Sequence, residues 1–326
     1  MRLLIATRGC RSVDCYERLN EIEEGSYGVV YRARDVQSGV VYALKQVKME
    51  NTDEGFSVHA LREISILMAH PHTNVVAVRE MVVGSTLNKI YMVMEFVDHD
   101  VKALMDRMKR ANARFSTAEI KCLLLQLLSG VAHLHDNWII HRDLKASNLL
   151  YSSGGVLKIA DLGLARHYGS PLRPYSPVVV TLAYRAPELL LGARLYSAPI
   201  DMWSVGCLFA EFLKHQPLFG TARSEIDLLD RMFKLLGTVT EAQWPGLSQL
   251  RNYSSVNFYV QPENRLRAAF SDIGSAGFDL LNRLLTYDPS KRATAKEALQ
   301  HAYFAEAPRP TSCGMMPTWP STAGNK

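Results

Sequence analysis

The most constraining feature of this sequence is a predicted β-hairpin that joins two polar motifs. Leu149–Tyr151 and residues 156–159 are short apolar runs, and the segment between them, 152–155, is typical of a tight turn. A hairpin brings its two ends to one place, so Asn148 before the first strand and Asp161 after the second should lie side by side. The sequence therefore predicts a site where an amide oxygen and a carboxylate meet.

The chemistry of these residues suits a phosphate-transfer site. Amide and carboxylate oxygens are hard ligands, and Mg²⁺ carrying nucleotide phosphates suits such a pair. Asp143, on the loop before the hairpin, is placed to accept a proton from an incoming hydroxyl, and Lys145 to hold the charge of a transferring phosphate. We therefore expect phosphate transfer from a magnesium-bound nucleotide.

The order of these motifs resembles that of the eukaryotic protein kinases. The run from His141 to Asn148 resembles their catalytic loop, Asp161-Leu162-Gly163 their metal-binding motif, and Ala186-Pro187-Glu188 the end of their activation segment. The resemblance covers nearly the whole chain. It implies an α+β, bilobal protein kinase fold, with a small β-rich N-lobe that carries one regulatory helix and a larger α-helical C-lobe.

Hydrophobic patterning agrees with two lobes. The 326 residues, 48% of them hydrophobic, exceed what one core usually supports. We expect strands at 19–23, 29–35, 40–48, 75–83 and 90–96, one helix at 57–68 among them, and mostly helix afterwards. The expected organisation is an N-terminal extension at 1–15, an N-lobe at 16–97, a C-lobe at 98–304 and a loosely wrapped tail at 305–326.

The resemblance implies ATP and Mg²⁺ as cofactors and assigns the residues that bind them. The expected catalytic residues are Asp143, Lys145, Lys45, Glu63 and Thr181, with Thr181 bridging Asp143 and Lys145. The expected metal ligands are Asn148 and Asp161. The nucleotide is expected to contact Ile22, Gly25, Gly28, Val30, Ala43, Lys45, Met94, Glu95, Val97, Asp100, Asn148, Leu150 and Asp161.

Regulatory and structural roles follow from the same resemblance. Three arginines are expected to converge near Ser176, where a phosphate would offset their mutual repulsion: Arg62, Arg142 and Arg166. Ser26 and Tyr27 are candidates for inhibitory phosphorylation beside the ATP phosphates. Two buried residues are expected to support the C-lobe, Asp201 beneath the catalytic loop and Arg292 paired with Glu188.

The predicted helix at 57–68 carries an apolar stripe of Val58, Leu61, Ile64 and Met68. It resembles the cyclin-contacting helix of cyclin-dependent kinases and is closest to the PITSLRE subfamily through Leu61-Arg62-Glu63. The tail motif 316–320, Met-Pro-Thr-Trp-Pro, supports the same subfamily. We expect a cyclin, of the L type by this resemblance, to press the helix inward, to bring Glu63 onto Lys45 and so to switch activity on.

Substrate choice is suggested by Val179, Val180, Thr181 and Arg185, which resemble the segment of proline-directed serine/threonine kinases. Protein substrates with Ser-Pro or Thr-Pro sites are therefore expected. The subfamily resemblance further implies nuclear work in transcription or pre-mRNA splicing, with the cytoplasm as a second compartment.

Three departures from the family pattern leave alternatives open. Residues 23–28 resemble the glycine-rich loop that covers the ATP phosphates in kinases, but Glu23 replaces its first glycine. Leu162 replaces the Phe that usually follows the metal-binding aspartate, and Ala183 replaces the Trp of cyclin-dependent kinases. A pseudokinase scaffold that binds cyclin is one alternative. A mitogen-activated-protein-kinase-like enzyme is another, although such enzymes have Thr-x-Tyr where this chain has Tyr175-Ser176-Pro177.

Charge, cysteine usage and hydropathy limit the other classes. The formal charge of +5 is spread along the chain, which does not indicate direct nucleic-acid binding. The five cysteines form no C-x-x-C pair, which argues against zinc and for a reducing compartment. No secretory signal and no run of about eighteen apolar residues is recognised, so a soluble protein without membrane contact is expected.

Overall fold

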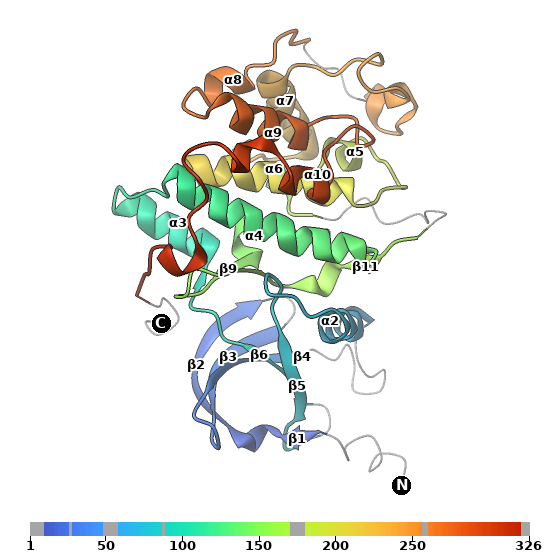
Figure 1. Cartoon of the computed structure of the whole chain (residues 1–326). Helices are drawn as coiled ribbons and strands as arrows, with labels where there is room; N and C mark the ends of the chain where they lie inside the picture. Colours follow the sequence, from blue (N-terminus) through green and yellow to red (C-terminus); the bar gives the residue numbers. More distant parts are fainter. Residues whose placement is uncertain are drawn as a thin grey trace.

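The computed structural model describes residues 10–25, 28–47, 58–86, 89–169, 180–255 and 260–320, and these form two lobes (Figure 1). The smaller lobe is built on a curled sheet, and the larger one is mostly helical. The expected two-lobed α+β fold, with one helix beside the sheet of the small lobe, is confirmed.

One six-stranded sheet forms the small lobe. Its strands are β1 (Arg11–Ser12), β2 (Tyr16–Gly25), β3 (Gly28–Asp35), β4 (Val41–Val47), β5 (Val78–Val83) and β6 (Ile90–Glu95), in the spatial order β1-β5-β6-β4-β3-β2. All neighbours are antiparallel except β1 and β5, which run parallel. Arg11 and Ser12, which the sequence placed in an extension, thus pair with Val82 and Val83 at the sheet edge.

Helix α2 (Val58–Ala69) lies beside this sheet, at the end of the small lobe that faces the large lobe (Figure 1). Ile66 and Leu67 point inward and are buried, which seats the helix. Leu61 and Met68, from the predicted apolar stripe, are instead 50% and 54% exposed. The helix therefore presents apolar side chains outward as well as inward.

The large lobe packs around two long helices, α4 (Thr117–Asp136) and α6 (Pro199–Lys214). A capping box fixes the start of α4, because Ser116 and Glu119 each accept a hydrogen bond from the other's backbone amide. The remaining helices are α3 (Val101–Arg110), α5 (Pro187–Leu190), α7 (Glu225–Leu236), α8 (Leu266–Ala269), α9 (Ser275–Leu284) and α10 (Ala295–Leu299). Trp203, Phe209 and Phe212 of α6 are fully buried at the centre of this core.

Short strands carry the polar motifs between the lobes. They are β7 (His99–Asp100), β8 (Ile139–Ile140), β9 (Leu149–Tyr151), β10 (Leu157–Ile159) and β11 (Arg166–His167). β10, β9 and β7 form one small sheet in that order, and β11 pairs with β8. The predicted hairpin is present as β9 and β10.

The lobes are joined by the segment that follows α2. Val75 forms a β-bridge with Ile159. The side-chain amide of Asn74 donates hydrogen bonds to the Leu157 carbonyl and to Gln126 Oε1 of α4. Gly130 of α4 allows this close approach, since a Cβ there would lie 2.8 Å from Ile159 Cδ1 and 2.9 Å from the Asn74 carbonyl oxygen. At Gly130 the helix backbone thus packs directly on the Asn74 backbone and the Ile159 side chain.

Helix α4 alone, within the described ranges, is long and apolar enough by length and composition to cross a membrane. The sequence reading had recognised no such run. In the fold, 67% of the most apolar window of α4 is buried, as in the core helix of a compact domain.

Candidate active site

The hairpin brings its two polar ends together. Leu149 pairs with Ile159 and Tyr151 with Leu157, so Asn148 and Ala160 follow directly at the open end. The Ala160 amide donates to the Asn148 carbonyl at 2.9 Å, and Asp161 comes next in the chain. The register of two short strands therefore sets the separation of the two expected metal ligands.

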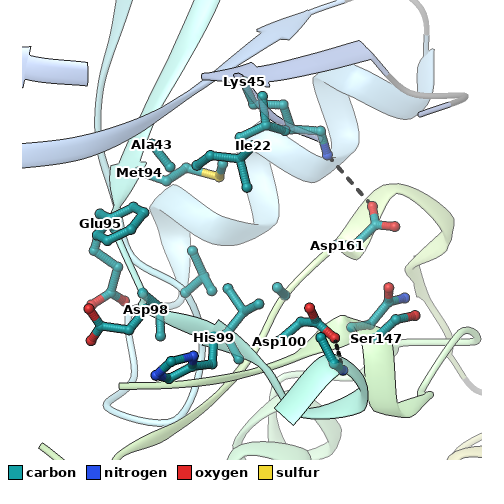
Figure 2. Close-up of a pocket in the computed structure, with 18 of the residues that line it drawn as sticks. Ile22, Ala43, Lys45, Met94, Glu95, Asp98, His99, Asp100, Ser147 and Asp161 are labelled. Atoms are coloured by element: carbon teal, nitrogen blue, oxygen red, sulfur yellow. Dashed lines mark hydrogen bonds and ion pairs between the residues drawn. The ribbon is translucent and has the colours of Figure 1, made fainter. Parts of the chain in front are cut away.

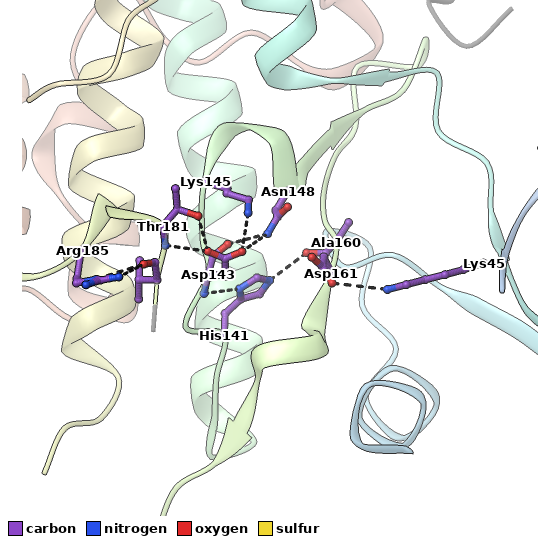
Figure 3. A network of polar contacts seen from close by, with 10 residues as sticks. Lys45, His141, Asp143, Lys145, Asn148, Ala160, Asp161, Thr181 and Arg185 are labelled. Atoms are coloured by element: carbon purple, nitrogen blue, oxygen red, sulfur yellow. Dashed lines mark hydrogen bonds and ion pairs between the residues drawn. The ribbon is translucent and has the colours of Figure 1, made fainter. Parts of the chain in front are cut away.

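Asp143 is the centre of a polar network drawn from two segments, the catalytic loop and the stretch at Thr181 (Figure 3). Its Oδ1 accepts from the Thr181 amide at 3.0 Å and from the Thr181 hydroxyl at 2.8 Å. Its Oδ2 accepts from Lys145 Nζ at 2.7 Å and from Asn148 Nδ2 at 3.1 Å. Thr181 and Lys145 thus meet at the two oxygens of one carboxylate.

A buried carboxylate holds the catalytic loop from beneath, as the sequence led us to expect. Asp201 of α6 accepts from the amides of His141 and Arg142, at 2.8 and 2.9 Å, and from His135 Nε2 at 3.0 Å. Burial alone would raise the pKa of Asp201, but the hydrogen bonds from His135 and the loop amides bring it below its usual value. The loop, in which Arg142 has φ 68°, is therefore held by a charged acceptor.

Lys45 of β4 is paired from both sides of the cleft. Its Nζ lies 2.7 Å from Glu63 Oε1 on α2 and 3.6 Å from Asp161 Oδ1. Burial alone would lower the pKa of Lys45, but the two carboxylates raise it above its usual value, so the ammonium stays charged. A protonated lysine at this position can bind a phosphate.

This pair bears on the role expected of a cyclin. A cyclin was expected to bring Glu63 onto Lys45, yet the ion pair is closed in the single chain. Ile66 and Leu67 are already buried against the body of the protein, which holds α2 in its inward position. In this conformation no second protein is needed to form the contact.

A pocket of about 520 Å³ opens between the lobes beside Lys45 and Asp161 (Figure 2). Ala43 and Met94, which are cross-strand partners, lie at its sheet side, and Leu150 at its opposite side. Every residue expected to contact the nucleotide lines this pocket, apart from Gly25, whose surroundings lie outside the description. The fold thus brings to one pocket the residues that the family resemblance assigned to the nucleotide.

Other lining residues were not singled out from the sequence. They include Leu67, Val76, Ser147 and Ala160. Ala160 directly precedes Asp161, so a small side chain beside a motif carboxylate was the signal that could have identified Ala160. Val76 comes from the segment that joins the lobes. No pattern in the sequence pointed to Val76, whose position depends on the contact with β10.

The donor set fits Mg²⁺ bound with a nucleotide. Asp161 Oδ1 is buried and has no hydrogen-bond partner within the described ranges, and the Asn148 amide nitrogen is used by Asp143, which leaves its oxygen for a cation. The part of the chain that the structure describes holds no cluster of three or more His, Cys, Asp or Glu that could bind a metal. Two protein oxygens completed by phosphate oxygens and water are typical of nucleotide-bound magnesium.

The expected regulatory residues are only partly covered. Ser26, Tyr27 and Ser176 lie outside the described residues. Arg62 Nη1 is buried without a hydrogen-bond partner among those described, and burial together with the charge of Arg142 lowers the pKa of Arg62. Arg142 donates to the Leu164 carbonyl and the Tyr196 hydroxyl, and Arg166 lies in β11.

The segment that begins at Val180 has an unusual backbone. Val180 has φ 68°, a left-handed conformation that β-branched residues rarely adopt. The Arg185 guanidinium holds it by donating to the Val180 carbonyl at 2.9 and 3.2 Å. Arg185 Nη1 in turn lies 2.5 Å from Glu225 Oε1 of α7. Because the Arg185 side chain is largely buried, this ion pair is stronger than it would be in water.

Two of the three departures can be placed. Leu162 is fully buried and remains an apolar plug next to Asp161, whereas Ala183 is partly buried against the main core. The side chain of Glu23 lies outside the description. The expected pair of Arg292 and Glu188 is present with two parallel contacts, at 2.7 and 2.9 Å.

Comparisons with known proteins agree with this geometry. The family model of the protein kinase domain matches residues 16–304. The chain is 56% identical to Cyclin-dependent kinase G-2 of Oryza sativa subsp. indica over 98% of its length, and 54% identical to Cyclin-dependent kinase 11B of Homo sapiens over 98%. It is also 54% identical to the Serine/threonine-protein kinase PITSLRE of Drosophila melanogaster over 96%. It spans 46%, 40% and 34% of these three proteins, less than half of each.

Proposed function

This chain belongs to the protein kinase domain family, and we propose that it transfers the γ-phosphate of ATP to serine or threonine hydroxyls of proteins, as a cyclin-dependent kinase. The observation that carries the proposal is the convergence at Asp143. Its carboxylate meets Lys145, Asn148 and Thr181 at the mouth of a pocket whose far side holds Lys45 and Asp161.

The residues divide the chemistry as follows. Asp143, held by Thr181 and Lys145, orients the substrate hydroxyl and accepts its proton. Lys145 and Lys45 supply positive charge on opposite sides of the phosphates, and Glu63 fixes the position of Lys45. When bound at Asn148 and Asp161, Mg²⁺ supplies the charge that offsets the negative phosphates.

We propose a preference for proline after the target residue and attribute it to Val180. Its carbonyl is taken by Arg185, so a substrate amide at that place would lose its acceptor. Proline has no amide hydrogen and loses nothing. Ser-Pro and Thr-Pro sites are therefore the proposed substrates.

The proposed partner is a cyclin, of the L type by subfamily resemblance, docked on α2. The exposed Leu61 and Met68 lie seven residues apart, on one face of the helix, where a partner would bury them. Because Lys45 and Glu63 are already paired, the partner would stabilise the active arrangement instead of creating it. Phosphate on Ser176 would pair with the uncompensated Arg62, and phosphate on Ser26 or Tyr27 would oppose ATP binding.

By the same resemblance we propose nuclear work in transcription or pre-mRNA splicing, with a cytoplasmic fraction. Imaging of the tagged protein and capture of its partners in its own cells test both points. Exclusion from the nucleus would contradict them.

Phosphate transfer provides the main test. The cyclin complex with Mg²⁺ and γ-labelled ATP should label a Ser-Pro peptide, but not the matched Tyr-Pro peptide. Asp143→Asn should lower the rate about 10²- to 10⁴-fold with nucleotide affinity retained. Nucleotide binding without transfer would instead identify a pseudokinase scaffold, and full turnover without cyclin would favour the mitogen-activated-protein-kinase-like alternative.

Two substitutions on α2 test the partner. Leu61→Lys together with Met68→Lys should weaken cyclin affinity about tenfold or more, because charges would enter an apolar contact. Leu195→Lys is the matched control, since Leu195 is 58% exposed on the large lobe. Equal losses in both variants would exclude α2 as the specific docking face.

Ser176→Ala tests the activating phosphate. Turnover of the cyclin complex should fall, because Arg62 would lose the phosphate that offsets its charge. Unchanged turnover with wild-type Ser176 shown to be phosphorylated would remove this switch.

A further inference from the structure

Residues 309–320, called here the C-terminal strap, lie along the large lobe beside α3, α4 and β9 (Figure 1). This is the side on which residues 96–98, called here the hinge, connect β6 to β7. The sequence reading expected a loose tail. Instead, Met316 is 4% exposed, and the Thr311 amide donates to the Ala118 carbonyl at the start of α4. The strap is therefore an integral layer of the fold.

The strap satisfies two buried polar side chains. The Tyr151 hydroxyl donates to the Pro317 carbonyl at 2.6 Å, and His99 Nε2 lies 3.1 Å from the Trp319 carbonyl. Tyr151 is fully buried and His99 is 2% exposed. A buried hydroxyl or imidazole that loses its partner is costly, so these contacts fix the position of both residues.

Shape complementarity reinforces the contact at the hairpin turn. Gly155 has φ 77°, and a Cβ there would lie only 2.1 Å from the Cys313 carbonyl oxygen. At Gly154, the neighbouring position, the nearest atom to such a Cβ would be Ser152 Oγ at 3.7 Å. The strap backbone thus touches the turn where the chain has no side chain.

The two strap-bound residues, His99 and Tyr151, pair across adjacent strands next to two residues of the nucleotide pocket, and His99 itself also lines that pocket. β7 pairs with β9 so that His99 faces Tyr151 and Asp100 faces Leu150. Asp100 and Leu150 line the pocket (Figure 2 labels Asp100). Asp98, just before them, accepts from the Ser153 amide, so the hinge is fixed to the same hairpin.

We propose that the strap positions the nucleotide site, with Tyr151 and His99 as positioning residues that transmit its hold to Leu150 and Asp100. The inference rests on the proposed function in that the pocket is taken to bind an adenine nucleotide. Loss of the strap would let strands β7 and β9 move. Asp100 and Leu150, which line the pocket, would then lose their fixed positions.

The most direct experiment ends the chain after Pro308. This cut removes the strap but keeps the Glu306 carbonyl and a backbone oxygen of Pro308, there part of the new terminal carboxylate, as acceptors for the buried Lys121. Met316→Lys displaces the strap in the full chain, and Met315→Lys is its control, because Met315 is 77% exposed. Tyr151→Phe removes one hydroxyl from the contact.

Three readouts separate positioning from general stability. The dissociation constant for Mg·ADP, the KM for ATP against kcat, and hydrogen exchange of the hinge should be measured for each folded variant. Truncation or Met316→Lys should raise the dissociation constant and the KM about fivefold with little change in kcat, Tyr151→Phe less, and Met315→Lys less than twofold.

The outcomes are distinguishable from failure of the proposed function. If the parent chain binds no nucleotide, the proposed function fails first. If the parent binds Mg·ADP and a folded variant with a freed strap binds it within twofold of the parent, the positioning role is overturned. Faster hinge exchange with unchanged affinity would overturn it as well.

Discussion

At the scale of single residues, Asp143 shows which parts of the site a sequence can predict. Its neighbours Lys145 and Asn148 follow within five residues, so motif spacing alone placed them together. Thr181 is 38 residues away and was placed only through family resemblance. Leu67 and Val76 of the pocket lining were not predicted, because their place depends on how the lobes pack.

A buried ion pair provides a prediction at this scale. Arg292 is fully buried and bound to Glu188 through two contacts, so Arg292→Met leaves a carboxylate uncompensated and should cost about 3 to 5 kcal/mol. Arg283→Met is the control, because Arg283 is 61% exposed and pairs with Asp279 on one helix face, worth about 0 to 1 kcal/mol. Urea unfolding measures both, and similar losses would contradict the assignment.

At the scale of elements, α6 lies in the part of the chain that was expected to be mostly helical, but the position of its end was not predicted. The helix closes on His215, which has φ 53° and is 3% exposed, with neither ring nitrogen hydrogen-bonded among the described residues. Burial lowers the pKa of His215, and the charges of Arg114 and Lys109 lower it further, against a smaller opposing effect of Asp106. Asparagine or glycine is the usual signal for such a helix end, so the sequence gave no warning.

This helix end predicts a pH dependence. The folded protein holds His215 neutral below its usual pKa of 6.5, so the unfolded chain binds more protons in that range. The contribution of His215 to the free energy of unfolding should be fully present above about pH 6.5. It should decrease as the pH drops toward the pKa of His215 in the folded protein. His215→Asn, which tolerates the left-handed backbone, should reduce this slope between pH 7.5 and 5.5, measured by urea unfolding.

Part of the slope should survive in that variant. Burial also lowers the pKa of His72, aided by the charges of His133 and Lys158, so His72 contributes with the same sign. An unchanged slope in His215→Asn would show that His215 is not held neutral by the fold.

At the scale of the whole molecule, the two lobes followed from motif order, whereas their junction did not. Asn74, Gly130 and Ile159 come from three distant segments, and each looks ordinary in its own sequence context. The N-terminal strand β1 was missed for a related reason, since two residues carry too little pattern to predict a strand.

The junction gives a prediction opposite to helix propensity. Replacing glycine by alanine inside a helix normally stabilises it by about 1 kcal/mol. Gly130→Ala should instead destabilise the protein by about 1 to 3 kcal/mol, because the new methyl would meet Ile159 and the Asn74 backbone. Gly169→Ala, where no atom lies within 4 Å of the new Cβ, is the control in thermal unfolding. Stabilisation by Gly130→Ala would show that the lobes separate readily.

The parallel pairing of β1 with β5 also bears on the solution behaviour of shorter fragments. A protein cut at Tyr16, where the family match begins, would lack Arg11 and Ser12 and leave one edge of β5 uncovered. That edge carries Val82 and Val83, and unpaired apolar edges recruit strands from other molecules. Fragments starting at Tyr16 should therefore self-associate as their concentration rises, while those starting at Cys10 should stay dispersed.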